Sequence, residues 1–212
     1  MIKEKIASTC KIYNKNNDDV NIIVVSKTIA SEKIYEAIAC GCKNFGENYV
    51  QEAYQKFPAI KENFPDISLH LIGHLQSNKV KEALEIFDYI HTLDSEKLAK
   101  ILSKEIQKQN KNLEIFIQVN IGQEAQKYGI AINDVDGFVK FCKKDLSLNI
   151  VGLMAIPPAD ELSSPYFALL KKIADKNNLA KISMGMSADY DQAIALGSTH
   201  IRLGTTIFGE RK

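Results

Sequence analysis

The chain repeats one unit of secondary structure eight times, and this rhythm constrains the fold more than any other feature. Each unit, about 25 residues long, is a short apolar run typical of a buried strand followed by a segment with apolar residues at helical spacing. Eight strands alternating with helices predict a (β/α)8 TIM barrel, which would take all of residues 1–212 as a single domain. The predicted strands are 22–26, 43–46, 68–72, 89–93, 113–119, 150–154, 181–184 and 200–203.

An open doubly wound sheet is the competing fold for the same alternation. That fold usually carries a glycine-rich phosphate turn after its first strand. Residues 26–30, Ser-Lys-Thr-Ile-Ala, contain no glycine, so the barrel is favoured. Another helix is expected over residues 2–13. Because the segment after Phe208 leaves almost no room for a closing eighth helix, we expect helix 2–13 to cover that side of the barrel.

Local signals predict where several helices begin and end. Ser31, and either Asp94 or Ser95, are hydroxyl or carboxylate residues placed to cap the helices that follow them. Pro58 and Pro65 are expected to break the chain before the third strand.

The charge balance bears on the class of partner. Lys and Arg number 27 and Asp and Glu 26, a formal charge of +1, and no basic stripe is interleaved with aromatic residues. This argues against a nucleic-acid or anionic membrane surface and favours small-molecule or protein partners. The N-terminus mixes acidic and basic residues, and no stretch approaches the roughly 18 apolar residues of a membrane span. We therefore expect a cytoplasmic protein, and a monomer.

The cysteines and histidines do not form a convincing metal motif. Cys40 and Cys42 end an apolar helical face and are interpreted as packed free thiols. His70 and His74 have the spacing of a helical pair, but the sequence around them predicts strand and loop. No metal site is predicted.

The residues just past the strands are unusually polar, and barrel enzymes carry their chemistry at these positions. Lys27 follows a first strand whose residues 22–25 are all β-branched. The others are Glu47, Asn48, His74, Gln76, Asp94, Asn120, Ser183, Ser187, Arg202 and Gly204. Since loops are polar in most proteins, position alone does not assign a function to any of them.

Two segments point to a phosphate. Residues 183–189 and 202–209 carry glycine and hydroxyl residues where barrels often hold one. Strand alternation puts Arg202 on the same face as Gly204. A strand-end lysine, a phosphate site and an arginine between them suggest pyridoxal 5′-phosphate, whose aldehyde condenses with lysine and whose ring nitrogen needs a partner. The alternative is that Lys27 and Arg202 bind two phosphates of a sugar substrate directly.

Several segments resemble one known family. They are VVSK (24–27), NFGENYVQE (44–52), HLIGHLQSNK (70–79), GLMAIP (152–157) and SMGMS (183–187), with the closing Phe208-Gly209. In this order, across nearly the whole chain, they resemble the YggS/PROSC family of pyridoxal phosphate homeostasis proteins. That family's fold resembles the barrel domain of alanine racemase.

The resemblance implies a cofactor site. Lys27 would hold pyridoxal 5′-phosphate as a Schiff base, and Arg202 would partner the ring nitrogen. Hydroxyl and backbone groups near residues 183–187 and 204–205 would hold the phosphate, and Asn48 would line the pocket. The implied cofactor-binding set is Lys27, Asn48, Ser183, Ser187, Arg202, Gly204 and Thr205.

The resemblance also implies a role in intracellular vitamin B6 homeostasis without established catalysis, with apo-enzymes that use the cofactor as partners. Racemisation requires acid–base groups on both faces of the cofactor, and in alanine racemase a second domain and a partner chain complete the site. This sequence is expected to end with the barrel, which favours a non-catalytic protein. A racemase of narrow scope is the alternative. The role of Gln76, Asn78 and Lys79, and a second cofactor site, are left open.

Overall fold

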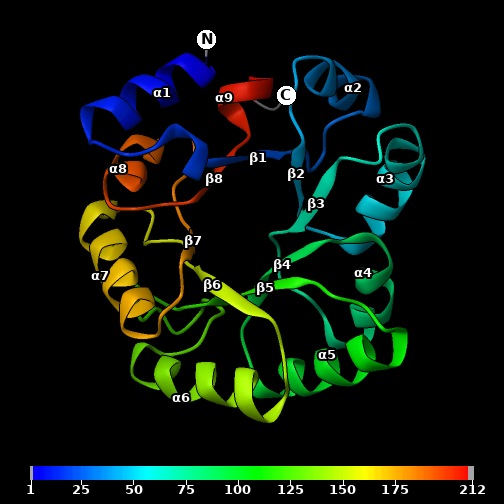
Figure 1. Ribbon diagram of the computed structural model, residues 1–212, viewed down its shortest axis with the longest axis vertical. Helices are drawn as coiled ribbons and strands as arrows, with labels where there is room; N and C mark the ends of the chain where they lie inside the picture. The colour runs from blue at the N-terminus through cyan, green and yellow to red at the C-terminus, as the bar shows by residue number, and fades with distance from the viewer. Residues whose placement is uncertain (1, 210–212) are drawn as a thin grey trace.

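Eight parallel strands close into a barrel at the centre of the molecule. The structure is a computed structural model that describes residues 2–209. Each strand pairs with the next along the chain, and β8 pairs with β1, so the predicted barrel is confirmed. Figure 1 shows the strands at the centre, surrounded by the helices. The strands are β1 (Asn21–Val25), β2 (Asn44–Glu47), β3 (Ser68–Leu71), β4 (Tyr89–Leu93), β5 (Glu114–Gln118), β6 (Ile150–Met154), β7 (Lys181–Ser183) and β8 (His200–Leu203).

Helices connect successive strands and form the outer layer. The helices of the described residues are α1 (Ile2–Ile12), α2 (Ser31–Ala39), α3 (Val50–Asn63), α4 (Val80–Ile86), α5 (Glu96–Gln109), α6 (Val135–Lys140), α7 (Ser163–Lys176), α8 (Tyr190–Ala195) and α9 (Thr205–Phe208). Short 3-10 turns cover Asn17–Asp19, Ser77–Lys79 and Ile132–Asp134, and α6 continues as a π-helical turn over Phe141–Asp145. Within the described part of the chain, no helix is long and apolar enough to span a membrane.

The main apolar core lies between the strands and the helices. Phe45 on β2 and Leu69 on β3 are fully buried there with Phe57 of α3. Completely burying a leucine or phenylalanine side chain stabilises a fold by about 1.5–3 kcal/mol. Because strand side chains alternate, the opposite faces of the same strands point into the barrel, and several of them are polar.

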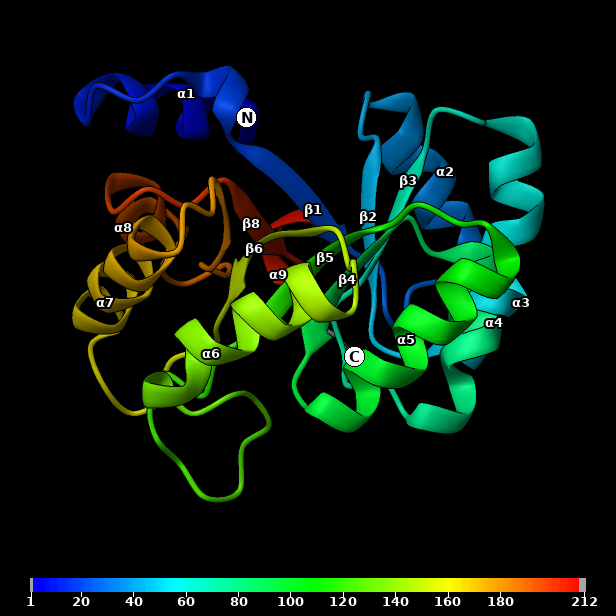
Figure 2. The same ribbon diagram turned by 60° about the horizontal axis from the view of Figure 1, so that its bottom comes forward.

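Helix α1 covers the seam between β8 and β1, as expected from the short segment after β8. Ile6 and Cys10 of α1 pack against Ile194 of α8 and against Ile201 and Leu203 of β8. Helix α9 has only four residues. Figure 2 shows α1 on the same side of the molecule as α8.

Two local predictions, for Pro58 and Ser31, were wrong, and the structure decides between the two cap candidates of α5. Pro58 lies inside α3, where the burial of Val50, Ala53, Phe57 and Ile60 together offsets the cost of an interior proline, about 3 kcal/mol. Ser31 begins α2, but Ala30 occupies the N-cap position and makes no side-chain capping bond. Asp94 caps nothing, because its carboxylate binds His74. Ser95 instead caps α5 by accepting a hydrogen bond from the Leu98 N–H at 3.4 Å.

Candidate functional site

The strand register brings Lys27 to the same end of the barrel as the other predicted residues. Val25 of β1 pairs with Gly46 of β2, and Val24 pairs with Leu203 of β8. Continuing both registers past the strand ends places Lys27 level with Asn48 on one side and with Thr206 on the other. Lys27, Asn48 and the beginning of α9 therefore meet at the carboxyl ends of the strands, where barrels carry their functional sites.

An ion pair supports the backbone next to Lys27. Glu47, the last residue of β2, is fully buried and accepts hydrogen bonds from Lys56 Nζ and from Ser26 Oγ, both at 2.7 Å. Lys56 Nζ also donates to the carbonyl oxygen of Ser26 at 2.8 Å. Burial raises the pKa of Glu47 above its ordinary value, although the bonds from Lys56 and Ser26 act in the opposite direction. The residue before Lys27 is thus fixed by an ion pair between β2 and α3.

The residue after Lys27 has an unusual backbone. Thr28 has φ +63°, a conformation that β-branched residues rarely adopt. Its N–H donates to Glu52 Oε1 at 2.5 Å, and Lys56 Nζ contacts the same oxygen at 2.9 Å. Helix α3 therefore holds the turn on both sides of Lys27 in one conformation.

Arg202 lies inside the barrel, 5% exposed. Its Nη1 donates to Ser183 Oγ at 2.8 Å and its Nη2 to the carbonyl oxygen of Ala155 at 3.0 Å. Among residues 2–209, no carboxylate forms an ion pair with it. Burial lowers the pKa of Arg202 to about 10, against the attraction of Asp189, so the guanidinium stays charged at neutral pH. A buried cation held only by neutral acceptors is suited to an electron-rich ligand atom.

Ser183 lies in the barrel interior, in contact with Arg202. Its hydroxyl is fully buried inside the barrel, bonded to Arg202 and to His91 Nδ1, the latter at 3.0 Å. The strand parity of β7 could have indicated this, because Ser183 ends the strand on its interior face.

Ser187 and α9 form a cradle of hydrogen-bond donors at the barrel mouth. Gly185, with φ +91°, makes the turn before Ser187, and a Cβ at this glycine would lie 2.4 Å from that of Ala193. Ser187 Oγ accepts a hydrogen bond from the N–H of Thr206 at 3.3 Å. Thr205 is exposed in the first turn of α9, where backbone N–H groups lack helical partners. Hydroxyls and such N–H groups suit a phosphate dianion.

Asn48 lines a separate pocket of about 320 Å³ together with the Gln76 and Lys79 segment. Gly73 lies against the Asn48 backbone, so closely that a Cβ there would meet the Asn48 carbonyl oxygen at 2.3 Å. Lys79 pairs with Glu82 at 2.8 Å. His74 also faces this pocket, where its ring stacks on Tyr128 with centroids 3.9 Å apart.

Three buried histidines were missed as part of the site, because the sequence was searched only for metal ligands. His70, His91 and His200 lie inside the barrel, at most 3% exposed. Burial is the largest cause that lowers their pKa values, well below the ordinary range for His70 and His91 and to about 3 for His200. Their inward parity on β3, β4 and β8 was visible in the sequence. The described residues contain no group of three or more side chains that could hold a metal ion.

Comparison with known proteins identifies the family. Residues 3–212 match the family described as alanine racemase, N-terminal domain. A pyridoxal phosphate homeostasis protein of Haemophilus influenzae is 36% identical, covering 100% of this chain and 93% of the relative. One from Vibrio cholerae is 39% identical, covering 99% and 93%. The chain belongs to the pyridoxal phosphate homeostasis protein family.

Solved structures agree with this assignment. PipY of Synechococcus elongatus without PLP superposes on this member of the pyridoxal phosphate homeostasis protein family with a TM-score of 0.87 at 35% identity, covering 99% of this chain and 100% of PipY. The same protein with PLP bound gives 0.84 at 34% identity, with the same coverage. An alanine racemase of Clostridium difficile, 12% identical with a TM-score of 0.72, covers 99% of this chain and 56% of its own length and shows the shared barrel fold.

Proposed function

We propose that this chain binds pyridoxal 5′-phosphate and takes part in the intracellular homeostasis of that cofactor. The observation that carries the proposal is the buried Arg202 guanidinium, which has no carboxylate partner among residues 2–209 and lies on β8, the strand that pairs with β1 before Lys27. The names of the curated relatives and the PLP-bound form of PipY support it.

Each residue would have a distinct role. Lys27 would supply the amine that links covalently to the aldehyde, and Arg202 would donate a hydrogen bond to the ring nitrogen. Ser187, with Gly204 and Thr205, would hold the phosphate, and Asn48 would line the mouth. The position of the Ser183 hydroxyl supports a role through Arg202 in place of the phosphate contact first predicted. When bound, the cofactor supplies an aldehyde and an electron-withdrawing ring.

Arginine as the ring partner favours storage over chemistry. A carboxylate would keep the ring nitrogen protonated and strongly electron-withdrawing, whereas a charged arginine can only donate. The resulting carrier would limit free aldehyde and pass the cofactor to apo-enzymes. We further propose that it does so as a cytoplasmic, monomeric, single domain.

Absorption spectroscopy tests the proposal. The purified protein should show a yellow visible band that borohydride abolishes, with the added mass on the peptide that contains Lys27. Lys27→Ala should remove both signals and keep the fold, while Lys33→Ala, a change in an exposed pair with Glu36 on α2, should keep both. A protein that stays colourless and unmodified with added pyridoxal phosphate would overturn the proposal and favour a phosphorylated sugar as ligand.

One observation favours testing a narrow racemase activity as a second function. His74 lies at the mouth, and its Nδ1 binds Asp94 at 2.8 Å, which orients the ring as a proton-transfer group. Incubation with single amino acids in deuterated water would then give Cα exchange faster than free cofactor does, and His74→Ala would slow it. Exchange no faster than with free cofactor across all amino acids would exclude this function.

A further inference from the structure

A row of hydrogen-bonded side chains crosses the barrel interior and ends at Arg202. We call it the interior hydrogen-bond chain, and its members are Asn44, His70, His91 and Ser183. Asn44 Oδ1 lies 3.3 Å from His70 Nε2. His70 Nδ1 lies 3.0 Å from His91 Nε2, and His91 Nδ1 lies 3.0 Å from Ser183 Oγ. The last contact is the 2.8 Å bond from Arg202 Nη1 to Ser183 Oγ.

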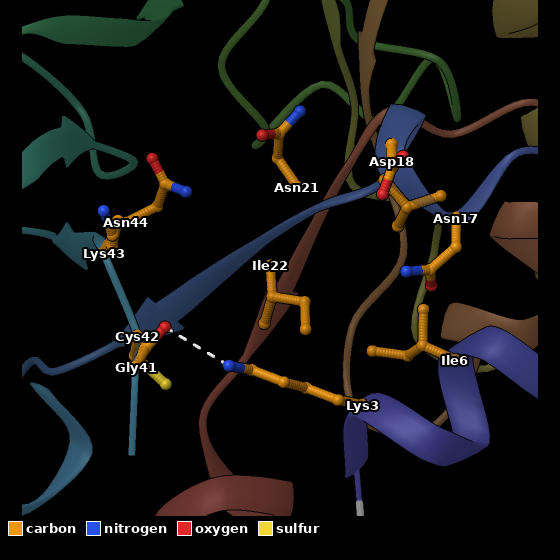
Figure 3. Close-up of a pocket in the computed structure, with 11 residues that line it drawn as sticks. Lys3, Ile6, Asn17, Asp18, Asn21, Ile22, Gly41, Cys42, Lys43 and Asn44 are labelled. Carbon is orange, nitrogen blue, oxygen red and sulfur yellow. Dashed lines mark hydrogen bonds between the residues drawn. The ribbon is translucent and has the colours of Figure 1, made fainter. Parts of the chain in front are cut away.

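Asn44, at one end of the interior hydrogen-bond chain, lies at the opposite end of the barrel from Lys27. Asn44 is the first residue of β2 and lines a pocket of about 330 Å³ with Asn21, the first residue of β1. Figure 3 shows Asn44 on the wall of this pocket, and Lys3 across from it, bonded to the Gly41 carbonyl oxygen at 3.2 Å. The chain therefore connects the amino-terminal end of the barrel with the predicted cofactor end.

The bond from Arg202 to Ser183 determines which atom is the donor and which the acceptor in every other bond of the interior hydrogen-bond chain. Arginine can only donate, so Ser183 Oγ accepts from Arg202 and its own O–H is free to donate to His91 Nδ1. His91 then carries its proton on Nε2 and donates to His70 Nδ1. His70 in turn carries its proton on Nε2 and donates to the Asn44 oxygen. In this arrangement each donor meets one acceptor.

If every donor and acceptor in the interior hydrogen-bond chain were exchanged, one buried hydroxyl would lack an acceptor. If both histidines carried their protons on Nδ1, Ser183 Oγ would accept twice, and its buried O–H would have no acceptor among residues 2–209, a cost of about 1–3 kcal/mol. Protonating His70 would place its Nδ1–H against the Nε2–H of His91, and protonating His91 would leave its Nδ1–H and the Ser183 O–H as two donors facing each other. Burial and the charges of Lys181 and Arg202 lower the pKa of His91, in agreement with a neutral ring.

We propose that the interior hydrogen-bond chain holds Arg202 in the orientation that the cofactor's ring nitrogen requires, so that its members are positioning residues. This inference rests on the proposed function. Because hydrogen bonds in a row polarise one another, a serine that donates into the chain is a stronger acceptor for the guanidinium. With the second bond to Ala155, two edges of the guanidinium plane are fixed, and its charge is kept because no member of the chain is anionic.

Side-chain nitrogen NMR of the cofactor-free protein tests the direction without any ligand. In long-range proton–nitrogen spectra, His70 and His91 should both be neutral with the proton on Nε2, and they should stay so at pH 6. A proton on Nδ1 of either ring, or a doubly protonated ring at pH 6, would overturn the inference.

Binding of pyridoxal 5′-phosphate and of its 1-deaza analogue, which lacks the ring nitrogen, tests the role. His91→Phe removes the acceptor for Ser183 and should weaken pyridoxal phosphate binding about tenfold, the value of one hydrogen bond to a charged group, with the deaza analogue unaffected. His91→Asn, whose carbonyl oxygen replaces Nδ1 as acceptor, should restore most of the affinity even though it leaves a larger void than phenylalanine does.

His200→Phe is the matched control. His200 is equally buried and contacts the His91 ring, but its Nδ1 binds Thr199 at 2.8 Å, outside the interior hydrogen-bond chain. The His200→Phe variant should leave the ratio between the affinities for pyridoxal 5′-phosphate and for its 1-deaza analogue unchanged. Equal losses for both ligands in His91→Phe, or no rescue by asparagine, would contradict a positioning role. If the wild-type protein bound neither ligand, the proposed function would fail, and the NMR result would still decide the direction of the chain.

Discussion

Two polar supports, one at each end of the predicted cofactor site, are built differently. Behind Lys27, Glu47 and Lys56 form a buried ion pair between the strands and α3. Beneath Arg202, the interior hydrogen-bond chain is uncharged and lies within the barrel. Ion pairs hold by charge and tolerate small changes in angle, whereas a neutral chain depends on which atom carries each proton. A charged arginine can thus be oriented without being neutralised.

Lowering the pH should have the largest effect on stability, because it acts on the buried neutral histidines. The folded-state pKa values of His70, His91 and His200 lie below the unfolded value of about 6.5, so the unfolded chain binds protons first as the pH falls. Stability present above pH 6.5 is therefore lost progressively toward pH 3, where His200 itself titrates. Three such groups should cost about 4 kcal/mol by pH 5.5.

Urea unfolding across pH 8 to 5.5 measures this loss. His91→Phe should reduce the slope by about one proton. A flat profile between pH 7 and 5.5 would mean that the histidines are not buried as neutral groups. Glu47, whose pKa is raised, acts with the opposite sign and offsets a little of the loss.

Removing one partner of the Glu47–Lys56 ion pair should reduce the free energy of unfolding nearly as much. Lys56→Met would leave Glu47 buried without its cation, which costs about 3–5 kcal/mol. Lys33→Met, in an exposed pair with Glu36, should change the free energy of unfolding by less than about 0.5 kcal/mol. Urea unfolding at pH 7 compares the two variants, and equal effects would show that Glu47 finds another partner.

The smallest difference concerns two serines. Ser26→Ala removes one bond to Glu47, which Lys56 still holds, and acts on the site only through the backbone, so it should weaken pyridoxal phosphate binding less than threefold. Ser183→Ala removes the acceptor of Arg202 and should weaken binding about tenfold. Fluorescence titration with pyridoxal phosphate would compare the affinities of the two variants. A larger loss in Ser26→Ala than in Ser183→Ala would contradict the comparison.

The fold was predictable because its signals are local. Strands 89–93, 150–154 and 200–203 were predicted with the bounds that the structure has, since apolar runs between helical segments mark them directly. Pro58 was misjudged because the burial of Phe57, a tertiary effect, decides that helix.

The site was only partly predictable. The strand-end rule predicted Lys27, Asn48 and Arg202 as site residues, because barrels place function there. Strand parity places Ser183, His70 and His91 inside the barrel, but it could not show that Ser183 bonds to Arg202 or that the two histidines join it. Those contacts join side chains that are 19 to 92 residues apart in the sequence.

Closure of the barrel limits how the cofactor could reach another protein. Because β1 pairs with β8, every strand in the described part of the chain has a neighbour on both sides. A partner enzyme therefore finds no exposed backbone edge on which to add a strand of its own. A transfer complex would therefore be built from side chains and loops, and the loops around Lys27 and α9 lie nearest to the predicted cofactor.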